Sequence, residues 1–301
     1  MEFKELMLAI GRRAYLEYRC GCWGLNKRFR KSVTAVTKQG RFTVLTADDA
    51  IGKVLYARGQ YELELMTKAT ALLRSLGRCP PRGQGTIADI GANNGVISVG
   101  MLYTGQFARA IAIEPEPRNF SLLQYNIKQN GFENDIICLP YAASSQEGEL
   151  VFELSSDNFG DHRVRTNSVV HEGEEKFGES GRRVIRVKSQ TLDALLLNVP
   201  DSFSSTLALV WVDVQGYEAF VFRGGQKLFS KSVPVVSEIW PYGMLRAGVT
   251  KEYYSKIAKD TWSSYWVLRR GRFVKYPIET LDLFYDELGM EGDSDNIIFT
   301  Q

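Results

Sequence analysis

A short strand that runs into a glycine-rich turn and then a helix constrains this chain more than any other feature. Residues 86–90 form a largely apolar run, and Gly91 and Gly95 follow with three residues between them. A strand, turn and helix of this kind opens the first βαβ unit of many cofactor-binding α/β proteins, where the turn brings backbone NH groups close to a ligand. The pattern therefore predicts a ligand site at the carboxyl end of this strand.

The spacing within the turn separates two classes of cofactor. A dinucleotide site has the pattern G-x-G-x-x-G, which lets the backbone approach a pyrophosphate. Here the spacing is G-x-x-x-G, with Ala92 and Asn93 inside the turn and Asp89 two residues before it. The carboxylate of Asp89 would repel a pyrophosphate but suits a cationic amino acid that carries a sulfonium. The turn thus favours S-adenosylmethionine, held near Asp89, Gly91, Ala92, Asn93 and Gly95.

The next two strands supply further groups for the same ligand. Residues 110–113 end in Glu114 and Pro115, and Glu114 lies twenty-three residues after Gly91. An acidic residue at this place can accept hydrogen bonds from ribose hydroxyls. The third strand, residues 136–139, is followed by Ala142 and Ser144 rather than by a carboxylate. We therefore expect backbone groups, Ser144 and apolar packing to hold the adenine.

The order of elements predicts an α/β core. From residue 86 onward, short apolar runs alternate with helical stretches, which indicates βαβ units and a parallel sheet. A hairpin-like pair brackets the polar residues 155–182, which hold both histidines and which we interpret as a mobile loop. Before the core, we expect a helical and hairpin extension over residues 1–85, followed by the core over residues 86–301. The expected strands cover residues 32–37, 41–46, 86–90, 110–113, 136–139, 149–154, 183–188, 207–212, 233–239, 262–268 and 296–300, and the expected helices cover residues 2–31, 61–76, 118–130 and 218–228, with one more from about residue 95.

Composition limits the cell compartment and the metal chemistry. With 44% hydrophobic and 24% charged residues, the chain has material for a large core. The longest apolar run near the middle, residues 207–212, is too short to span a membrane, and the N-terminus does not have the pattern of a signal peptide. We therefore expect a cytoplasmic protein with no transmembrane segment. Four cysteines without paired spacing and only two histidines predict neither a zinc site nor a disulfide framework.

The first 41 residues are strongly basic. They hold ten Lys and Arg against three Glu, whereas the whole chain has a net charge of only +2. Such a segment can bind an acidic partner, a membrane surface or RNA. The simpler interpretation is an amphipathic helix that packs on the core and exposes its charges to solvent.

Taken together with residues further along, these segments resemble the FkbM family of S-adenosylmethionine-dependent methyltransferases. The resemblance covers about residues 51–238. It implies a Rossmann-like, seven-stranded class I methyltransferase sheet and transfer of a methyl group to a hydroxyl of a sugar, glycolipid or secondary metabolite. Trp211 stands where the family commonly has a lysine, which places one basic contact in doubt. The segments that carry the resemblance are Tyr61-Glu62, Asp89 to Gly95, Glu114-Pro115, Asn126 and Asn130, Ala142 to Ser144, Thr191 to Asp193, Asp213 to Glu218, and Glu238.

Four residues are candidates for catalysis. Asp213 follows the strand at residues 207–212 and is the first candidate for the base that takes the hydroxyl proton, because ligands sit at the carboxyl ends of such strands. Glu218 could contact the substrate or only complement a helix dipole. Glu238 could bind acceptor hydroxyls or lie on the surface. His162 in the polar loop is the other candidate base, unless it is merely exposed.

Some alternatives stay open. Asp213 could instead cap a helix or stabilise the sulfonium, and Tyr61 and Glu62 could close over the cofactor or only anchor the N-terminal helix. A magnesium site on Asp213 and Glu238 is conceivable, but no spacing demands it, so we predict no metal. Competing functions are a nucleic-acid methyltransferase that uses the basic arm and a non-catalytic S-adenosylmethionine-binding protein. The sequence fixes neither the acceptor nor the oligomeric state.

Overall fold

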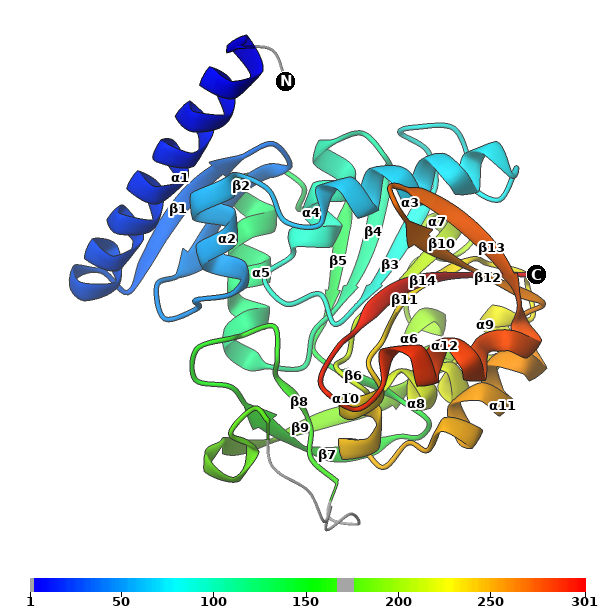
Figure 1. The fold of residues 1–301 in the computed structure, drawn as a ribbon. Coiled ribbons are helices and arrows are strands. Elements are labelled where there is room, and N and C mark those ends of the chain that lie inside the picture. Colours follow the sequence, from blue (N-terminus) through cyan, green and yellow to red (C-terminus); the bar gives the residue numbers. More distant parts are fainter. Residues whose placement is uncertain (1–2, 167–175) are drawn as a thin grey trace.

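The computed structural model describes residues 3–166 and 176–301. An eight-stranded sheet with helices on both faces forms its centre (Figure 1). Five strands run parallel, and the antiparallel β14 lies between β11 and β12. The strand order is β13-β12-β14-β11-β10-β3-β4-β5, with bounds β3 Thr86–Ile90, β4 Arg109–Ile113, β5 Ile136–Leu139, β10 Leu207–Val212, β11 Val235–Ile239, β12 Ser264–Arg269, β13 Arg272–Pro277 and β14 Asp295–Thr300.

This sheet confirms the Rossmann-like seven-stranded class that the sequence predicts. All seven expected strands are present, and β13 adds an eighth at the edge, where it pairs with β12. The strand β13 was not predicted from the sequence, because Arg272 and Lys275 are exposed and interrupt its alternation of apolar residues. Edge strands often carry such charges, which discourage pairing with other chains.

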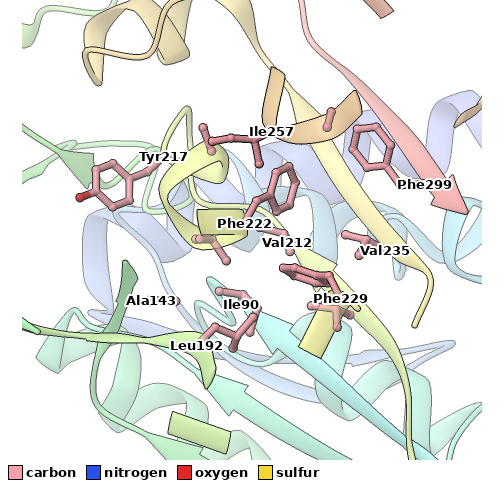
Figure 2. Close-up of a cluster of buried hydrophobic side chains, with 14 of the residues drawn as sticks. Ile90, Ala143, Leu192, Val212, Tyr217, Phe222, Phe229, Val235, Ile257 and Phe299 are labelled. Carbon is pink, nitrogen blue, oxygen red and sulfur yellow. The ribbon is translucent and has the colours of Figure 1, made fainter. Parts of the chain in front are cut away.

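Helices cover both faces of the sheet. Aromatic and aliphatic side chains fill one face, among them Val212 on β10 and Phe222 on a covering helix (Figure 2). The expected helix at residues 218–228 is divided into two short helices at Gly225. The helices beyond the N-terminal segment are α4 Val96–Tyr103, α5 Pro117–Gln129, α6 Leu192–Leu197, α7 Asp201–Ser204, α8 Glu218–Gly224, α9 Gln226–Phe229, α10 Pro241–Arg246, α11 Lys251–Thr261 and α12 Leu281–Leu288.

The N-terminal segment packs on the other face of the sheet. Its elements are α1 Phe3–Phe29, β1 Ser32–Thr37, β2 Gly40–Leu45, α2 Ile51–Arg58 and α3 Leu63–Ser75. The side chains of Asn126 and Asn130 on α5 accept hydrogen bonds from the NH groups of Thr43 and Arg41 on β2. These two amides therefore fasten the hairpin to the core. In the described part of the chain, no helix is long and apolar enough to cross a membrane.

A small second sheet lies beside the carboxyl ends of the parallel strands. It contains β6 Ala142–Ser144, β7 Gly148–Leu154, β8 Arg163–Val164 and β9 Arg183–Thr191, in the order β6-β9-β7-β8. The antiparallel pair β7 and β9 confirms the expected hairpin. The prediction of a mobile loop between them needs correction, because His162 and Arg163 are buried in this sheet and its contacts. His171 lies outside the described residues.

Candidate active site

A pocket lies where β3, β4 and β10 end and the small sheet begins. Its enclosed volume is about 50 Å³, and the pocket also opens to solvent. None of its described lining residues is Lys or Arg. They are Ile90, Gly91, Asn93, Ile113, Glu114, Pro115, Asn119, Tyr141, Ala142, Ala143, Phe152, Phe159, Gly160, His162, Val164, Asp213, Val214, Gln215 and Tyr217.

The glycine turn forms the floor of this pocket. Gly91 has a φ of 88°, and a Cβ atom there would lie 1.9 Å from the backbone oxygen of Asp213. The turn after β3 and the turn after β10 therefore touch through a position that has no room for a side chain. Asp89 is buried behind this contact, where its carboxylate accepts hydrogen bonds from the NH of Ser98 at 3.0 Å and from its hydroxyl at 2.5 Å. Asp89 thus holds the turn against α4 rather than lining the pocket.

Glu114 occupies the position expected for a ribose ligand. One carboxylate oxygen accepts the NH of Asn93 at 2.8 Å, and the other accepts the NH of Glu116 at 2.8 Å. These contacts fix the orientation of the carboxylate, and each oxygen keeps capacity for one more donor. Burial raises the pKa of Glu114 to about 8. Hydroxyl donors at the carboxylate would favour its charged form.

The small sheet closes one side of the pocket. Ala142 and Ala143 line it as expected, but the hydroxyl of Ser144 lies 3.1 Å from that of Tyr217 and Ser144 does not line the pocket. Tyr217 and Phe159 line the pocket instead, and neither residue was predicted from the sequence as part of the site. The Nδ2 atom of Asn93 donates to the carbonyl of Phe159 at 2.7 Å, which connects the glycine turn to the segment between β7 and β8.

His162 is buried and lines the pocket; it is not an exposed loop residue. Its Nδ1 atom accepts the NH of Ser155 at 3.0 Å, so the ring proton belongs on Nε2. Burial lowers the pKa of His162 to about 3, so the ring is neutral at physiological pH. A neutral ring with Nδ1 occupied can donate from Nε2 but cannot take a proton. We therefore correct its assignment as a candidate base.

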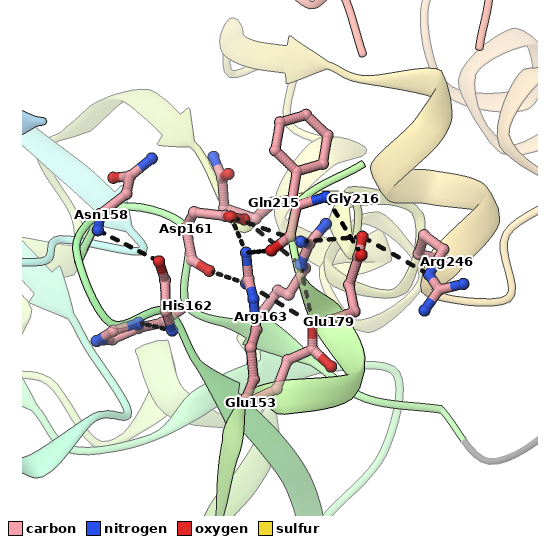
Figure 3. Close-up of polar contacts among 12 residues, drawn as sticks. Glu153, Asn158, Asp161, His162, Arg163, Glu179, Gln215, Gly216 and Arg246 are labelled. Carbon is pink, nitrogen blue, oxygen red and sulfur yellow. Dashed lines mark hydrogen bonds and ion pairs between the residues drawn. The ribbon is translucent and has the colours of Figure 1, made fainter. Parts of the chain in front are cut away.

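A buried network of charged side chains lies next to His162 and fixes the position of this segment (Figure 3). Arg163 is 2% exposed and forms ion pairs with Glu153, Asp161 and Glu179. Arg182 pairs with Asp161 from a neighbouring segment. A buried network of this kind specifies one arrangement, because an unpaired buried charge is costly.

Three polar groups meet at the ends of β10 and β11. The Nε2 atom of Gln215 donates to Asp213 Oδ1 at 2.7 Å and to Glu238 Oε2 at 3.0 Å. Ser294 donates to the other oxygen of Glu238 at 2.8 Å. Burial raises the pKa of Asp213, and burial together with the charges of Asp213 and Glu218 raises that of Glu238. Asp213 lines the pocket.

Glu218 supports this edge from behind. Its Oε1 atom accepts the NH groups of Val214 at 3.1 Å and Gly216 at 3.2 Å, and its side chain is fully buried. Burial raises the pKa of Glu218 to about 7. Gly216 in turn packs against Gly243 so closely that a Cβ atom would lie 2.2 Å from the carbonyl carbon of Gly243. We therefore correct the candidate catalytic role of Glu218 to that of a positioning residue.

Tyr61 and Glu62 precede α3 in the N-terminal segment, and neither lines the pocket. Burial, followed by the charges of Asp213 and Asp89, raises the pKa of Glu62 to about 8. Burial and the charges of Glu62 and Asp213 also raise the pKa of the Tyr61 hydroxyl. Across residues 3–166 and 176–301, no group of three or more His, Cys, Asp or Glu side chains is arranged to hold a metal ion.

The comparison with known families agrees with this geometry. The sequence profile of the methyltransferase FkbM domain matches residues 89–254, which is more than half of the chain. The chain belongs to the FkbM methyltransferase family. The match begins at Asp89 and includes the glycine turn, Glu114, the small sheet, Asp213 and Glu238. No curated protein matches the chain.

Solved structures give weaker likenesses. A methyltransferase FkbM from Methylobacillus flagellatus is 13% identical, with a TM-score of 0.40, and the match covers 75% of this chain and 45% of that one. The tRNA m1G37 methyltransferase of M. jannaschii is 11% identical, with a TM-score of 0.38 and coverages of 90% and 56%. The precorrin-6y C5,15-methyltransferase of Geobacter metallireducens is 10% identical, with a TM-score of 0.37 and coverages of 78% and 89%. Membership of the FkbM family rests on the sequence match.

Proposed function

We propose that this FkbM-family protein is an S-adenosylmethionine-dependent O-methyltransferase that acts on a hydroxyl of a sugar, glycolipid or secondary metabolite. The observation that supports the proposal is that the pocket is lined by acidic side chains and by no basic Lys or Arg side chain among the described residues. Glu114 and Asp213 line it, and its described lining residues include no Lys or Arg. Such a pocket suits a cationic cofactor and opposes a pyrophosphate.

The residues of the pocket fit S-adenosylmethionine. Glu114 would accept the ribose hydroxyls, and Pro115, Ala142 and Ala143 offer apolar surface to the adenine. The Nε2 proton of His162 is free for an acceptor atom of the ligand, because this buried nitrogen has no hydrogen-bond partner among the described residues. When bound, the cofactor supplies a methyl group activated by a sulfonium.

Asp213 is the proposed base. Because Gln215 occupies Oδ1, the acceptor hydroxyl would place its proton on Oδ2. A raised pKa suits a base that works near neutral pH, since base strength and ionised fraction are then balanced. Glu238, which accepts a hydrogen bond from the same Gln215 amide, would accept hydrogen bonds from other hydroxyls of the acceptor.

Replacing Glu114 with glutamine is expected to weaken S-adenosylmethionine binding about tenfold or more. The amide keeps the shape of the side chain but removes the charge that strengthens hydrogen bonds from the ribose, and such bonds contribute about 1.5 to 3 kcal/mol. Its NH2 group also cannot accept one of the two backbone NH groups that the carboxylate accepts. Isothermal titration calorimetry measures the change. Glu133→Gln is the matched control, because Glu133 is exposed and does not line the pocket. Equal affinity in Glu114→Gln and the control would remove Glu114 from the site.

The acceptor class can be tested with methyl-labelled S-adenosylmethionine and a host extract. After the reaction, the extract is divided into organic-soluble, polysaccharide and nucleic-acid fractions. We expect label in the organic-soluble or polysaccharide fraction, and its loss with Asp213→Asn protein. Label in nucleic acid would support the competing function that uses the basic arm. Cofactor binding without label in any fraction would support a non-catalytic protein.

A further inference from the structure

The long N-terminal helix α1 is only partly covered by the protein. In Figure 1 it runs outward from the body, beside β1 and α2 at its C-terminal end. Three residues at helical spacing form its packed side. Trp23 is 2% exposed, Arg19 donates to the carbonyl of Tyr56, and Asn26 donates to the hydroxyl of Tyr56. Lys27 on the same side pairs with Asp49. Most of the other described side chains of residues 11–29 are exposed.

A line of large apolar side chains lies next to the packed side. Tyr18, Leu25 and Phe29 are 67%, 62% and 74% exposed. Their spacings of seven and four residues place them on one side of the helix. Tyr15 is exposed near the same line, at 58%. Single exposed apolar residues are common, but an aligned set on an uncovered helix marks a surface for contact.

Exposed cations lie at the C-terminal end of this line. Arg28, Arg30 and Lys31 are exposed within two residues of Phe29, and the guanidinium of Arg28 lies 5.6 Å from the centre of the Phe29 ring. The one acid between residues 11 and 31, Glu17, is paired with Arg13. Since residues 1–41 have seven more basic than acidic residues, two copies of this helix would repel each other. An anionic surface would attract it. Leu25 and Phe29 also need an apolar environment, which lipid acyl chains supply and nucleic-acid phosphates do not.

We infer that α1 binds an anionic lipid surface. Tyr18, Leu25 and Phe29 enter the boundary between headgroups and acyl chains, and the neighbouring cations contact lipid phosphates. The helix lies on the membrane and does not cross it, in agreement with its many charges. This inference is independent of the proposed methyl acceptor, because it concerns a different surface.

Vesicle co-sedimentation of the full chain tests the inference. The probes are vesicles of phosphatidylglycerol with phosphatidylcholine and vesicles of phosphatidylcholine alone. We expect binding to the anionic vesicles only, and weaker binding as salt rises. Combining Tyr18→Ser, Leu25→Ser and Phe29→Ser should lower the partition coefficient at least about tenfold. Arg28→Gln with Lys31→Gln should lower it by a similar factor, since each cation near an anionic surface contributes about fivefold.

A matched control separates this surface from general hydrophobicity. Leu197→Ser with Leu283→Ser removes two apolar side chains that are 80% and 70% exposed on α6 and α12, and should leave binding unchanged. Thermal unfolding checks that each variant is folded. Equal loss in the control, or no binding of the intact chain to anionic vesicles, would overturn the inference. So would a dimer in sedimentation that Leu25→Ser converts to a monomer, because a second copy would then cover the helix.

Discussion

Replacing Gly91 with alanine is expected to destroy the cofactor site. The new Cβ atom would lie 1.9 Å from the backbone oxygen of Asp213, and φ at this position is 88°, which alanine rarely adopts. Overlap and backbone strain together should cost about 3 kcal/mol or more of the free energy of unfolding. If the turn moves to relieve the overlap, the substitution lowers ligand affinity rather than the free energy of unfolding. The affinity for S-adenosylmethionine should then fall about a hundredfold.

Gly59→Ala is the matched control for this variant. Gly59 also has a positive φ, 67°, but a Cβ atom there would have no neighbour within 4 Å. We expect it to lose only about 1 kcal/mol, the usual cost of a left-handed residue that is not glycine. Thermal unfolding and calorimetry of both variants measure the difference. If both variants behave alike, the close contact between the two turns is not a feature of the protein.

Asp213→Asn should reduce kcat by about two to four powers of ten. Asparagine keeps the shape of the side chain and can still accept the bond from Gln215, but it cannot take a proton. Cofactor affinity should fall less than kcat, because Glu114 is unchanged while the loss of the Asp213 charge weakens the attraction of the pocket for a cation. Steady-state methyl transfer measures kcat, and calorimetry measures affinity. Asp293→Asn, at an exposed position, serves as the control.

The pH profile gives a second readout of the same base. Asp213 must be ionised to act, and its pKa is raised by burial. Activity should therefore fall as pH decreases through an apparent pKa above the ordinary aspartate value of about 3.9. Asp213→Asn should lose this acidic limb along with most of its activity. An active variant with an unchanged acidic limb would assign the proton to another group.

The strands and turns of the core could be predicted because their sequence signals are local. Residues 86–95 and Glu114-Pro115 show strand, turn and ligand carboxylate within short stretches, and the parallel arrangement follows from the βαβ rhythm. The structure keeps all of these features. The position of Asp213 at the same edge followed from the rule that ligands sit at the carboxyl ends of parallel strands.

The roles of His162 and Glu218 could not be predicted because they depend on contacts outside their own motifs. His162 becomes a neutral wall through its bond to Ser155 and through the buried Arg163 network. Phe159 joins the site through its carbonyl contact with Asn93, sixty-six residues away in the chain. Its signal in the sequence is slight, an aromatic residue followed by Gly160 in a polar stretch. Glu218 accepts a backbone hydrogen bond within the turn that precedes its own helix. Only its complete burial in the structure distinguishes this positioning role from contact with substrate.

The most direct test of the account is calorimetric titration of the intact chain with S-adenosylmethionine and, separately, with NAD. The pocket lined by Glu114 and Asp213, without Lys or Arg among its described lining residues, should bind one S-adenosylmethionine per chain and give no heat with NAD. Binding of NAD, or the absence of any binding of S-adenosylmethionine by folded protein, would contradict the account.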